Sequence, residues 1–253
     1  EVKNFLIMRL TKEDIMNFDN VDNHSLPIAL NKDFNCLELK NVCFSFQNKN
    51  ILNNINLRIK EGDKICIIGE SGSGKTTLLS IMMGLLEASR GDIEINKKEI
   101  NQENLLNYQS QIGYVSQDIF ISDDTILSNI AIGESKSDID ISRINKVIEL
   151  SNMGDFINDS SKKLSSRVGT KGVKLSGGQI QRIGIARALY RDPKIIFFDE
   201  ATSSLDEKNE TIILENIFRA FNKRTIVFVT HKKQLVRYFD KVIKVDNGRV
   251  TTL

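Results

Sequence analysis

The sequence lacks a dominant charge, a cysteine framework and any long hydrophobic run. Its 35 lysine and arginine residues nearly balance its 33 aspartate and glutamate residues, so the net charge of +2 gives no reason to expect a nucleic-acid partner. Its three cysteines, Cys36, Cys43 and Cys66, are too few and too irregularly spaced for a metal site or a set of disulfides. No apolar stretch approaches the ~18 residues of a membrane-spanning helix.

The chain is long enough, at 253 residues, for one large domain with an ample core. It carries no signal peptide and opens with Glu1 in place of a start methionine, so we expect it to be part of a longer polypeptide. Residues 1–36 are mixed and polar, which is typical of a linker. We expect this linker to follow a transmembrane region.

The pattern of apolar residues predicts an α/β fold. Residues 37–59 alternate between apolar and polar, as in half-exposed antiparallel strands, and 91–96 repeat the pattern. Residues 118–190 are mostly helical in pattern, with Ile141–Leu150 and Ile180–Tyr190 the clearest segments. Two buried strands, at 195–198 and 226–229, flank a helix through 212–221, which indicates a parallel sheet. Ligands of such sheets bind beyond the C-terminal ends of the strands.

A phosphate-binding loop is the clearest motif in the chain. Residues Gly69–Thr76 read GESGSGKT, which fits the pattern G-x-x-x-x-G-K-[ST]. An apolar strand over Lys64–Ile68 precedes the loop, and a helical pattern over Thr77–Leu86 follows it. This context places backbone N–H groups at a helix N-terminus, where they bind phosphate oxygens. Lys75 reaches the terminal phosphates and Thr76 offers a hydroxyl to Mg²⁺; a chance match in a flexible loop is the weaker interpretation.

Two further motifs carry polar groups that suit nucleotide chemistry. The apolar strand before Asp199 ends in two adjacent carboxylates, of which Asp199 suits Mg²⁺ binding and Glu200 suits polarisation of an attacking water. An acidic turn after a core strand is the plain alternative. Residues 175–179 read LSGGQ just before a helix, and this segment is either a second anion site or a simple N-cap by Ser176. The residues alone do not separate these two interpretations.

The set of motifs GESGSGKT, LSGGQ, IIFFDE and a lone histidine after the last expected strand resembles the nucleotide-binding domain of an ABC transporter. The resemblance covers the chain from Leu37 to its end. It implies a P-loop NTPase (RecA-like) core with a parallel sheet and an antiparallel β subdomain over 37–117 and 191–253, and an α-helical signature subdomain over 118–190. It also implies a head-to-tail dimer that encloses ATP between the phosphate loop of one domain and the LSGGQ segment of the other.

The resemblance also assigns roles to individual residues. Gln117 matches the glutamine that touches Mg²⁺ and the attacking water, Glu200 the catalytic glutamate, and His231 the histidine that contacts the γ-phosphate. Phe46 stands where the family stacks an aromatic ring on adenine, although an ordinary strand-face aromatic explains it equally well. By resemblance, Mg²⁺ would be held by Thr76, Gln117 and Asp199, and ATP by Gly69, Ser71, Gly72, Ser73, Gly74, Lys75, Thr76, Thr77, Ser176, Gly177, Gly178, Gln179 and Asp206, the last through a contact with the partner subunit.

Several details favour an exporter among ABC proteins. Glu200 is followed by Ala-Thr-Ser where importer ATPases more often have proline, and residues 125–130 fit the exporter pattern T-I-x-x-N-I. Residues 168–172 resemble the exporter X-loop, with Thr170 where many exporters have glutamate; Lys232 also replaces the usual arginine. Apolar residues near Phe5–Leu10 and at 81–86 resemble bacterial peptide exporters of the colicin V type, which often carry a cysteine protease domain.

The sequence therefore predicts an active ATPase that powers export of a substrate, with a peptide as the expected cargo. Its expected partners are a second nucleotide-binding domain and a transmembrane domain of the same polypeptide, at the cytoplasmic face of the membrane. Lipids, lipid-linked glycans and drugs remain alternative substrates. The alternative functions are an importer subunit, a soluble ABC protein and a phosphate-loop kinase, the last of which would lack LSGGQ.

Overall fold

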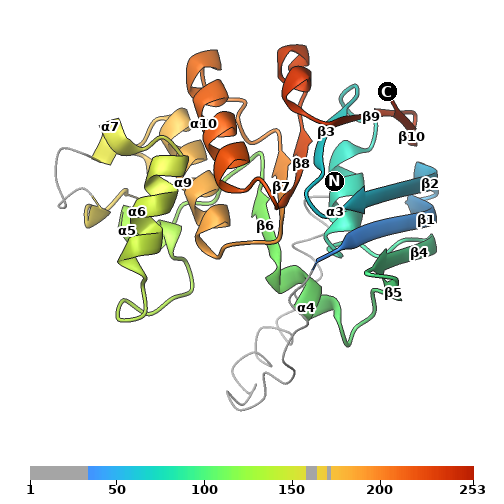
Figure 1. Cartoon of the computed structure of the whole chain (residues 1–253), viewed down its shortest axis with the longest axis horizontal. Helices are drawn as coiled ribbons and strands as arrows, with labels where there is room; N and C mark the ends of the chain where they lie inside the picture. The colour runs from blue at the N-terminus through green and yellow to red at the C-terminus, as the bar shows by residue number, and fades with distance from the viewer. Residues whose placement is uncertain (1–33, 158–163, 170–171) are drawn as a thin grey trace.

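Two β-sheets and a group of helices make up the part of the chain described by this computed structural model, residues 34–157, 164–169 and 172–253 (Figure 1). The linker expected over residues 1–36 lies almost wholly outside these ranges, as do Thr170 of the expected X-loop and the segment Phe5–Leu10.

A six-stranded sheet with the order β10-β9-β3-β8-β7-β6 forms the centre of the molecule. The strands from β9 to β6 pair in parallel, and β10 closes the edge in antiparallel fashion. The strands predicted at 195–198 and 226–229 are present, but the second is not the last in the chain, because β9 and β10 follow it. The bounds are β3 Lys64–Ile68, β6 Ile112–Val115, β7 Ile195–Asp199, β8 Thr225–Val229, β9 Lys241–Asp246 and β10 Arg249–Thr252.

A separate antiparallel sheet with the order β2-β1-β4-β5 confirms the alternation seen in the sequence. Leu39 on β1 pairs with Leu57 on β2, and both strands turn buried apolar side chains to one face. In Figure 1 this sheet lies to the right of β6, β7 and β8 and below β9 and β10. Its strands are β1 Cys36–Phe46, β2 Lys49–Lys60, β4 Arg90–Ile95 and β5 Lys98–Glu99.

Helix α3 (Lys75–Met82) lies in the core shared by the two sheets. Leu78, Leu79 and Ile81 are almost fully buried there, which explains the apolar spacing in the sequence. The helix starts two residues earlier than predicted and ends four residues earlier, because the chain turns at Gly84 with a φ of 66°.

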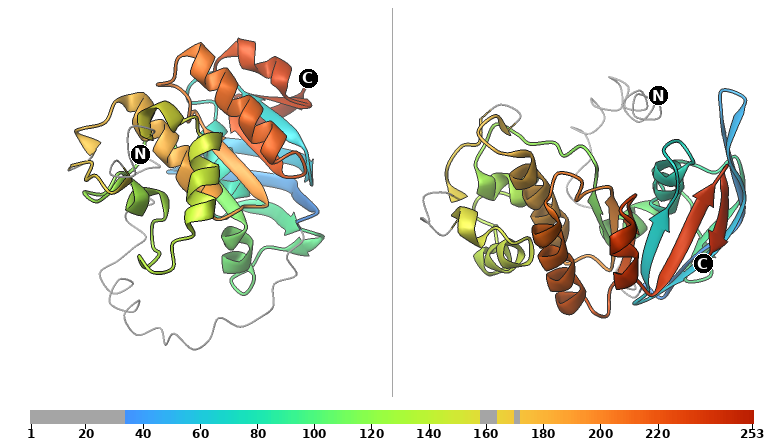
Figure 2. Two further views of the ribbon diagram at one scale, coloured as in Figure 1. Left: turned by 60° about the vertical axis from the view of Figure 1, so that its left-hand side comes forward. Right: turned by 90° about the horizontal axis from the view of Figure 1, so that it is seen from above.

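Helix α4 packs beside α3, with the Tyr108 hydroxyl donating to the carbonyl oxygen of Met82, and the other helices cover the opposite face of the six-stranded sheet (Figure 2). Helix α6 matches its predicted bounds, whereas α9 begins at Gly177, three residues before the prediction, because Ser176 caps it. No helix in the described ranges is long and apolar enough to cross a bilayer. The elements are α4 Leu105–Ser110, α5 Ile126–Ile130, α6 Ile141–Leu150, α7 Gly154–Ile157, α9 Gly177–Tyr190, α10 Glu207–Ala220 and the 3₁₀ helix η2 Lys233–Tyr238.

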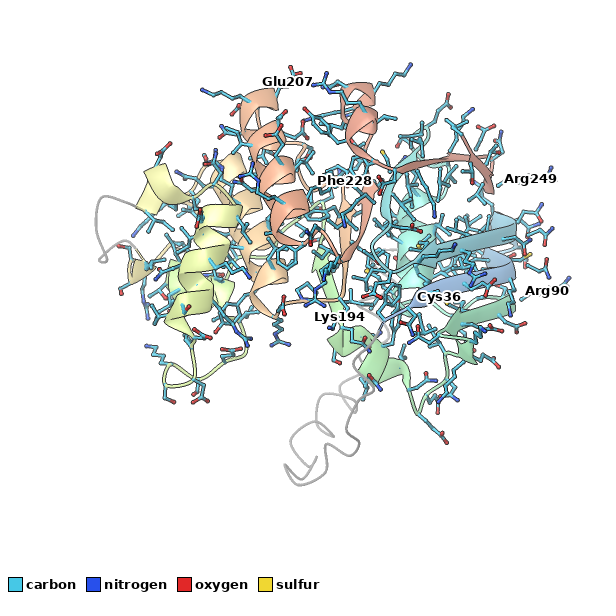
Figure 3. All side chains as sticks on the ribbon, viewed as in Figure 1. Cys36, Arg90, Lys194, Glu207, Phe228 and Arg249 are labelled. Carbon is cyan, nitrogen blue, oxygen red and sulfur yellow. The ribbon has the colours of Figure 1, made fainter. Side chains whose placement is uncertain are left out.

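The six-stranded sheet separates two hydrophobic cores. On β7, Ile196 and Phe198 point into the core formed with the helices, while Ile195 and Phe197 point into the core that contains α3. Phe228 of β8 lies on the helical side, labelled near the centre of the molecule in Figure 3, with its ring 5.2 Å from that of Phe198. Because both faces are buried, these strands are continuous apolar runs that end in polar residues at one edge.

Candidate functional site

The loop between β3 and α3 is built around the buried ammonium group of Lys75. This side chain is 6% exposed, and its Nζ donates hydrogen bonds to the carbonyl oxygens of Gly69, at 3.0 Å, and Glu70, at 2.8 Å. A side chain at Gly69 is excluded because a Cβ there would lie 2.3 Å from the carbonyl oxygen of Val245. The loop therefore presents one buried cation at the C-terminal end of a central strand.

The residues of this loop fit the phosphates of a nucleotide. The N-terminus of α3 has no side-chain cap, because Gly74 occupies the cap position with a φ of 106°. Among the residues that the structure describes, the buried hydroxyl oxygen of Ser73 has no hydrogen-bond partner. Free N–H groups at a helix N-terminus, an unpaired hydroxyl and a lysine together form an environment that favours anions. The geometry supports the expected contact of this loop with ATP.

Thr76 and Asp199 come together from opposite parts of the sequence. The Thr76 hydroxyl donates a hydrogen bond of 3.4 Å to Oδ1 of Asp199, which ends β7 and is only 5% exposed. Burial raises the pKa of the Asp199 carboxyl; the Thr76 hydrogen bond and nearby Lys75 lower it, and Glu200 raises it. A hydroxyl beside a buried carboxylate fits Mg²⁺, which prefers hard oxygen ligands and would stabilise the ionised form.

Glu200 and His231 follow neighbouring strands, β7 and β8. Nδ1 of His231 lies 3.7 Å from Oε2 of Glu200; the glutamate side chain is 23% exposed and the histidine 60%. Glu200 has a φ of 49°, a backbone conformation that residues other than glycine rarely adopt. Its N–H donates a hydrogen bond of 3.1 Å to the carbonyl oxygen of Val229. Such backbone strain is typical of residues whose side chain must be aimed at a substrate. The arrangement gives Glu200 access to solvent and a neighbouring imidazole.

Two other predicted residues are placed less directly. Gln117 is exposed two residues beyond the end of β6, and in the described part of the chain it has no hydrogen bond to Asp199 or Glu200. Phe46 ends β1 and packs, partly buried, against the core that contains α3. The structure is compatible with either interpretation of Phe46, as an adenine contact or as an ordinary strand aromatic.

The LSGGQ segment forms a capping box at the start of α9. The Ser176 hydroxyl accepts the N–H of Gln179 at 3.3 Å, and the Gln179 side chain accepts the N–H of Ser176 at 2.8 Å. The simple N-cap is therefore present, while Ser176 and Gly177 stay exposed. Within the described residues no hydrogen bond joins this segment to Lys75 or its loop. Within one chain, the two predicted anion sites remain separate.

Asp206 caps helix α10. Its Oδ1 accepts the N–H of Asn209 at 3.0 Å and its Oδ2 accepts the Asn209 side-chain amide at 2.5 Å, so the pKa of the Asp206 carboxyl is lowered by these hydrogen bonds. The contact predicted for Asp206 is with a second subunit, and its two hydrogen bonds to Asn209 lie within one chain.

Two residues near the site carry roles that the motifs did not indicate. Gln181 is 3% exposed, and its side chain binds both Ser203 and Ser204. Lys232 binds Thr202 and the buried Glu210. The signal for Gln181 is a polar residue on the buried face of a helix. The only sequence signal for Lys232 is its replacement of the usual arginine.

Comparison with known proteins agrees with this geometry. Residues 52–203, more than half of the chain, match a protein-family model described as ABC transporter. The lacticin-481/lactococcin-DR transport/processing ATP-binding protein of Lactococcus lactis subsp. lactis is 34% identical over 247 residues, which cover 96% of this chain and 33% of that protein. The alpha-hemolysin translocation ATP-binding protein of Escherichia coli O157:H7 is 37% identical over 217 residues, covering 85% and 30%.

A solved structure shares the fold. A bacterial Atm1-family ABC exporter with ATP bound superposes with a TM-score of 0.81 at 28% identity, over 94% of this chain and 43% of that one. The predicted fold class, an α/β P-loop core with an antiparallel β subdomain and a helical subdomain, is confirmed. The chain spans only about a third of the length of the curated relatives described above.

Proposed function

We propose that this chain powers the export of a peptide across a membrane. It belongs to the ABC transporter family and is an ATP-binding and ATP-hydrolysing domain. The observation that carries the proposal is the convergence of Lys75, Thr76, Asp199 and Glu200 at one edge of the parallel sheet. The relatives named for transport of lacticin and translocation of hemolysin support a peptide or protein cargo.

The chain's own residues divide the work of ATP hydrolysis. Lys75 and the N–H groups at the start of α3 bind the terminal phosphates. Glu200 accepts the proton of the attacking water, and His231, whose Nδ1 lies 3.7 Å from Oε2 of Glu200, contacts the γ-phosphate. The products are ADP, inorganic phosphate and a proton.

Mg²⁺ is the metal that this site would hold. Thr76 and Asp199 would be its direct protein neighbours, and Gln117 would approach it from the end of β6. When bound, the ion neutralises negative charge on the phosphates during hydrolysis.

Two copies of the domain complete the proposed assembly. The separation of Ser176–Gln179 from the phosphate loop within one chain supports a head-to-tail dimer, in which each LSGGQ segment and Asp206 face the partner's nucleotide. Residues 37–117 and 191–253 would form the ATP-binding core, and 118–190 the helical part. A transmembrane domain of the same polypeptide, with this domain at the cytoplasmic face, would complete the exporter.

The first experiment measures phosphate release from ATP by the 253-residue chain, with and without Mg²⁺. We expect hydrolysis that requires Mg²⁺ and rises more than linearly with protein concentration, since each active site needs two copies. Hydrolysis that is strictly linear in protein would contradict the dimer, and no hydrolysis would contradict the enzymatic proposal.

The second experiment tests the cargo. The full-length gene product in proteoliposomes should accumulate a peptide carrying a double-glycine leader when ATP is supplied, and the Glu200→Gln variant of the same preparation should not. Movement of a fluorescent phospholipid or a drug dye in place of the peptide would reassign the substrate. ATP-driven movement of a substrate in the opposite direction, towards the side of the membrane that carries this domain, would favour an importer.

A further inference from the structure

Lys232 makes a buried ion pair directly beside the residues of the proposed catalytic pair. Its Nζ lies 3.0 Å from both carboxylate oxygens of Glu210, a residue of α10 whose side chain is 0% exposed. The same Nζ donates a hydrogen bond of 3.2 Å to the carbonyl oxygen of Thr202. The Lys232 side chain is 19% exposed. Within the described residues, the hydrogen bonds of this ammonium group therefore all go to α10 and to the segment after β7.

Lys232 and its partner Thr202 lie close in the sequence to the two members of the catalytic pair. Lys232 directly follows His231, and Thr202 is two residues beyond Glu200. The backbone N–H of Lys232 donates to the Thr230 hydroxyl at 3.0 Å, which fixes its own turn. The chain after β8 is thus bound by a side chain to the chain after β7.

Two hydrogen bonds connect the segment after β7 with the segment after β8, and the catalytic pair lies beside them. At the strand end, the N–H of Glu200 donates to the carbonyl oxygen of Val229 at 3.1 Å. At the far end, Lys232 binds Thr202. In the described part of the chain the side chain of His231 makes one ion-pair contact, of 3.7 Å with Glu200, and it is 60% exposed. Its position therefore depends on the segment that carries it.

Stability alone is a weak reason for this ion pair. Desolvation of the fully buried Glu210 and the partly buried Lys232 offsets much of their attraction, and apolar residues of similar volume often replace a buried ion pair without loss of stability. An ion pair does supply direction, because a charged group accepts few alternative positions when its partner is buried and fixed. Glu210 has no hydrogen-bond partner among the described side chains other than Lys232.

We propose that Lys232 is a positioning residue for ATP hydrolysis: through Glu210 and the Thr202 carbonyl it fixes His231 against Glu200. This inference rests on the proposed function and adds a residue to the same site. A shift of about 1 Å in a catalytic group costs up to ~10²-fold in rate. The expected effect lies in kcat, because Lys232 is not placed on the nucleotide.

The test compares four variants of the 253-residue chain in kcat, KM, ATP affinity by calorimetry and thermal midpoint. Lys232→Met should lower kcat by about 10–10²-fold, with ATP affinity nearly unchanged. Lys232→Arg should keep most of the activity, because a guanidinium also donates to a carboxylate and a carbonyl. Lys241→Met is the matched control: it removes an ion pair with Asp63, at 2.6 Å, at the other end of β3 and β9, and should leave kcat unchanged.

The double variant Lys232→Met with Glu210→Leu separates the effect of Lys232 on the placement of His231 from its effect on the stability of the fold. It removes both charges, so it should recover the thermal midpoint lost in Lys232→Met while kcat stays low. Recovery of both quantities would overturn the inference, and so would an unchanged kcat in Lys232→Met. If the unaltered chain hydrolyses no ATP, the proposed function fails and this inference with it; if it does hydrolyse ATP, these variants decide on Lys232 alone.

Discussion

The side-chain oxygen of Gln181 accepts the backbone N–H of Ser204 at 2.9 Å, while its amide nitrogen donates to the Ser203 hydroxyl at 3.0 Å. Gln181 lies on α9, one turn beyond the Ser176 cap. Ser203 and Ser204 lead to Asp206, the cap of α10. The start of α9 and the segment that leads to Asp206, both predicted to face a partner subunit, are therefore joined by hydrogen bonds within one chain.

The two hydrogen bonds of the Gln181 side chain should contribute to the stability of the fold. The Gln181→Ala variant removes both hydrogen bonds of a side chain that is 3% exposed, whereas water can reach the exposed Ser203 and Ser204, so we expect each lost bond to lower the free energy of unfolding by about 0.5–1.5 kcal/mol. Urea denaturation measures it. The exposed Gln234→Ala is the matched control and should change stability by less than about 0.5 kcal/mol. An equal change in the free energy of unfolding in both variants would show that the hydrogen bonds of Gln181 do not stabilise the fold.

Substitution of the proposed proton acceptor should separate binding from turnover. Glu200→Gln keeps the shape of the side chain and its partly exposed place beside His231, but removes its basic oxygen. We expect turnover to fall by about 10²–10⁴-fold with ATP affinity retained. Phosphate release and calorimetric titration with ATP measure the two quantities. Hydrolysis at the rate of the unaltered chain would refute the role of Glu200.

The buried ammonium of Lys75 should contribute to nucleotide affinity. In Lys75→Ala, the phosphates lose a charged donor, which corresponds to about 1.5–3 kcal/mol of binding free energy. Calorimetric titration with ATP checks this value. The exposed Lys223→Ala removes the same charge at the end of α10 and should bind ATP normally. Unchanged affinity in Lys75→Ala would remove this lysine from the site.

The buried carboxyl of Asp199 predicts a pH dependence of stability. Its pKa is raised in the folded chain, chiefly by burial, so the folded state holds the proton more tightly than the unfolded state. The protonated carboxyl therefore stabilises the fold only in acid, and that contribution is lost as the pH rises from the usual aspartate pKa of 3.8 through the raised pKa of the folded chain. At neutral pH, Asp199→Asn should melt at a higher temperature than the unaltered chain.

Thermal denaturation without nucleotide, at neutral pH and at about pH 4, tests this sign. The advantage of Asp199→Asn should shrink in acid. Addition of ATP and Mg²⁺ should stabilise the unaltered chain more than the variant, since the ion binds the ionised carboxylate. A variant that is less stable than the unaltered chain at neutral pH without nucleotide would contradict the prediction.

Most of the strands and the phosphate loop were predictable because their signals are local. A buried parallel strand such as β7 must be apolar along its length, and Gly69–Thr76 carries its chemistry in eight consecutive residues. The strands β9 and β10 were not predicted. They alternate with polar residues such as Lys244 and Asp246, and β10 is an edge strand with little burial.

The residues by themselves determined the ligand class and the fold class, since glycine turns, an uncapped helix start and apolar strand runs follow from local chemistry. Only the tertiary structure decided which polar groups meet. Thr76 reaches Asp199 across 123 positions because β3 and β7 both flank β8 and end at the same edge of the sheet. Lys232 reaches Glu210 and Thr202 for the same reason, since long-range contacts depend on strand order, which no local pattern contains.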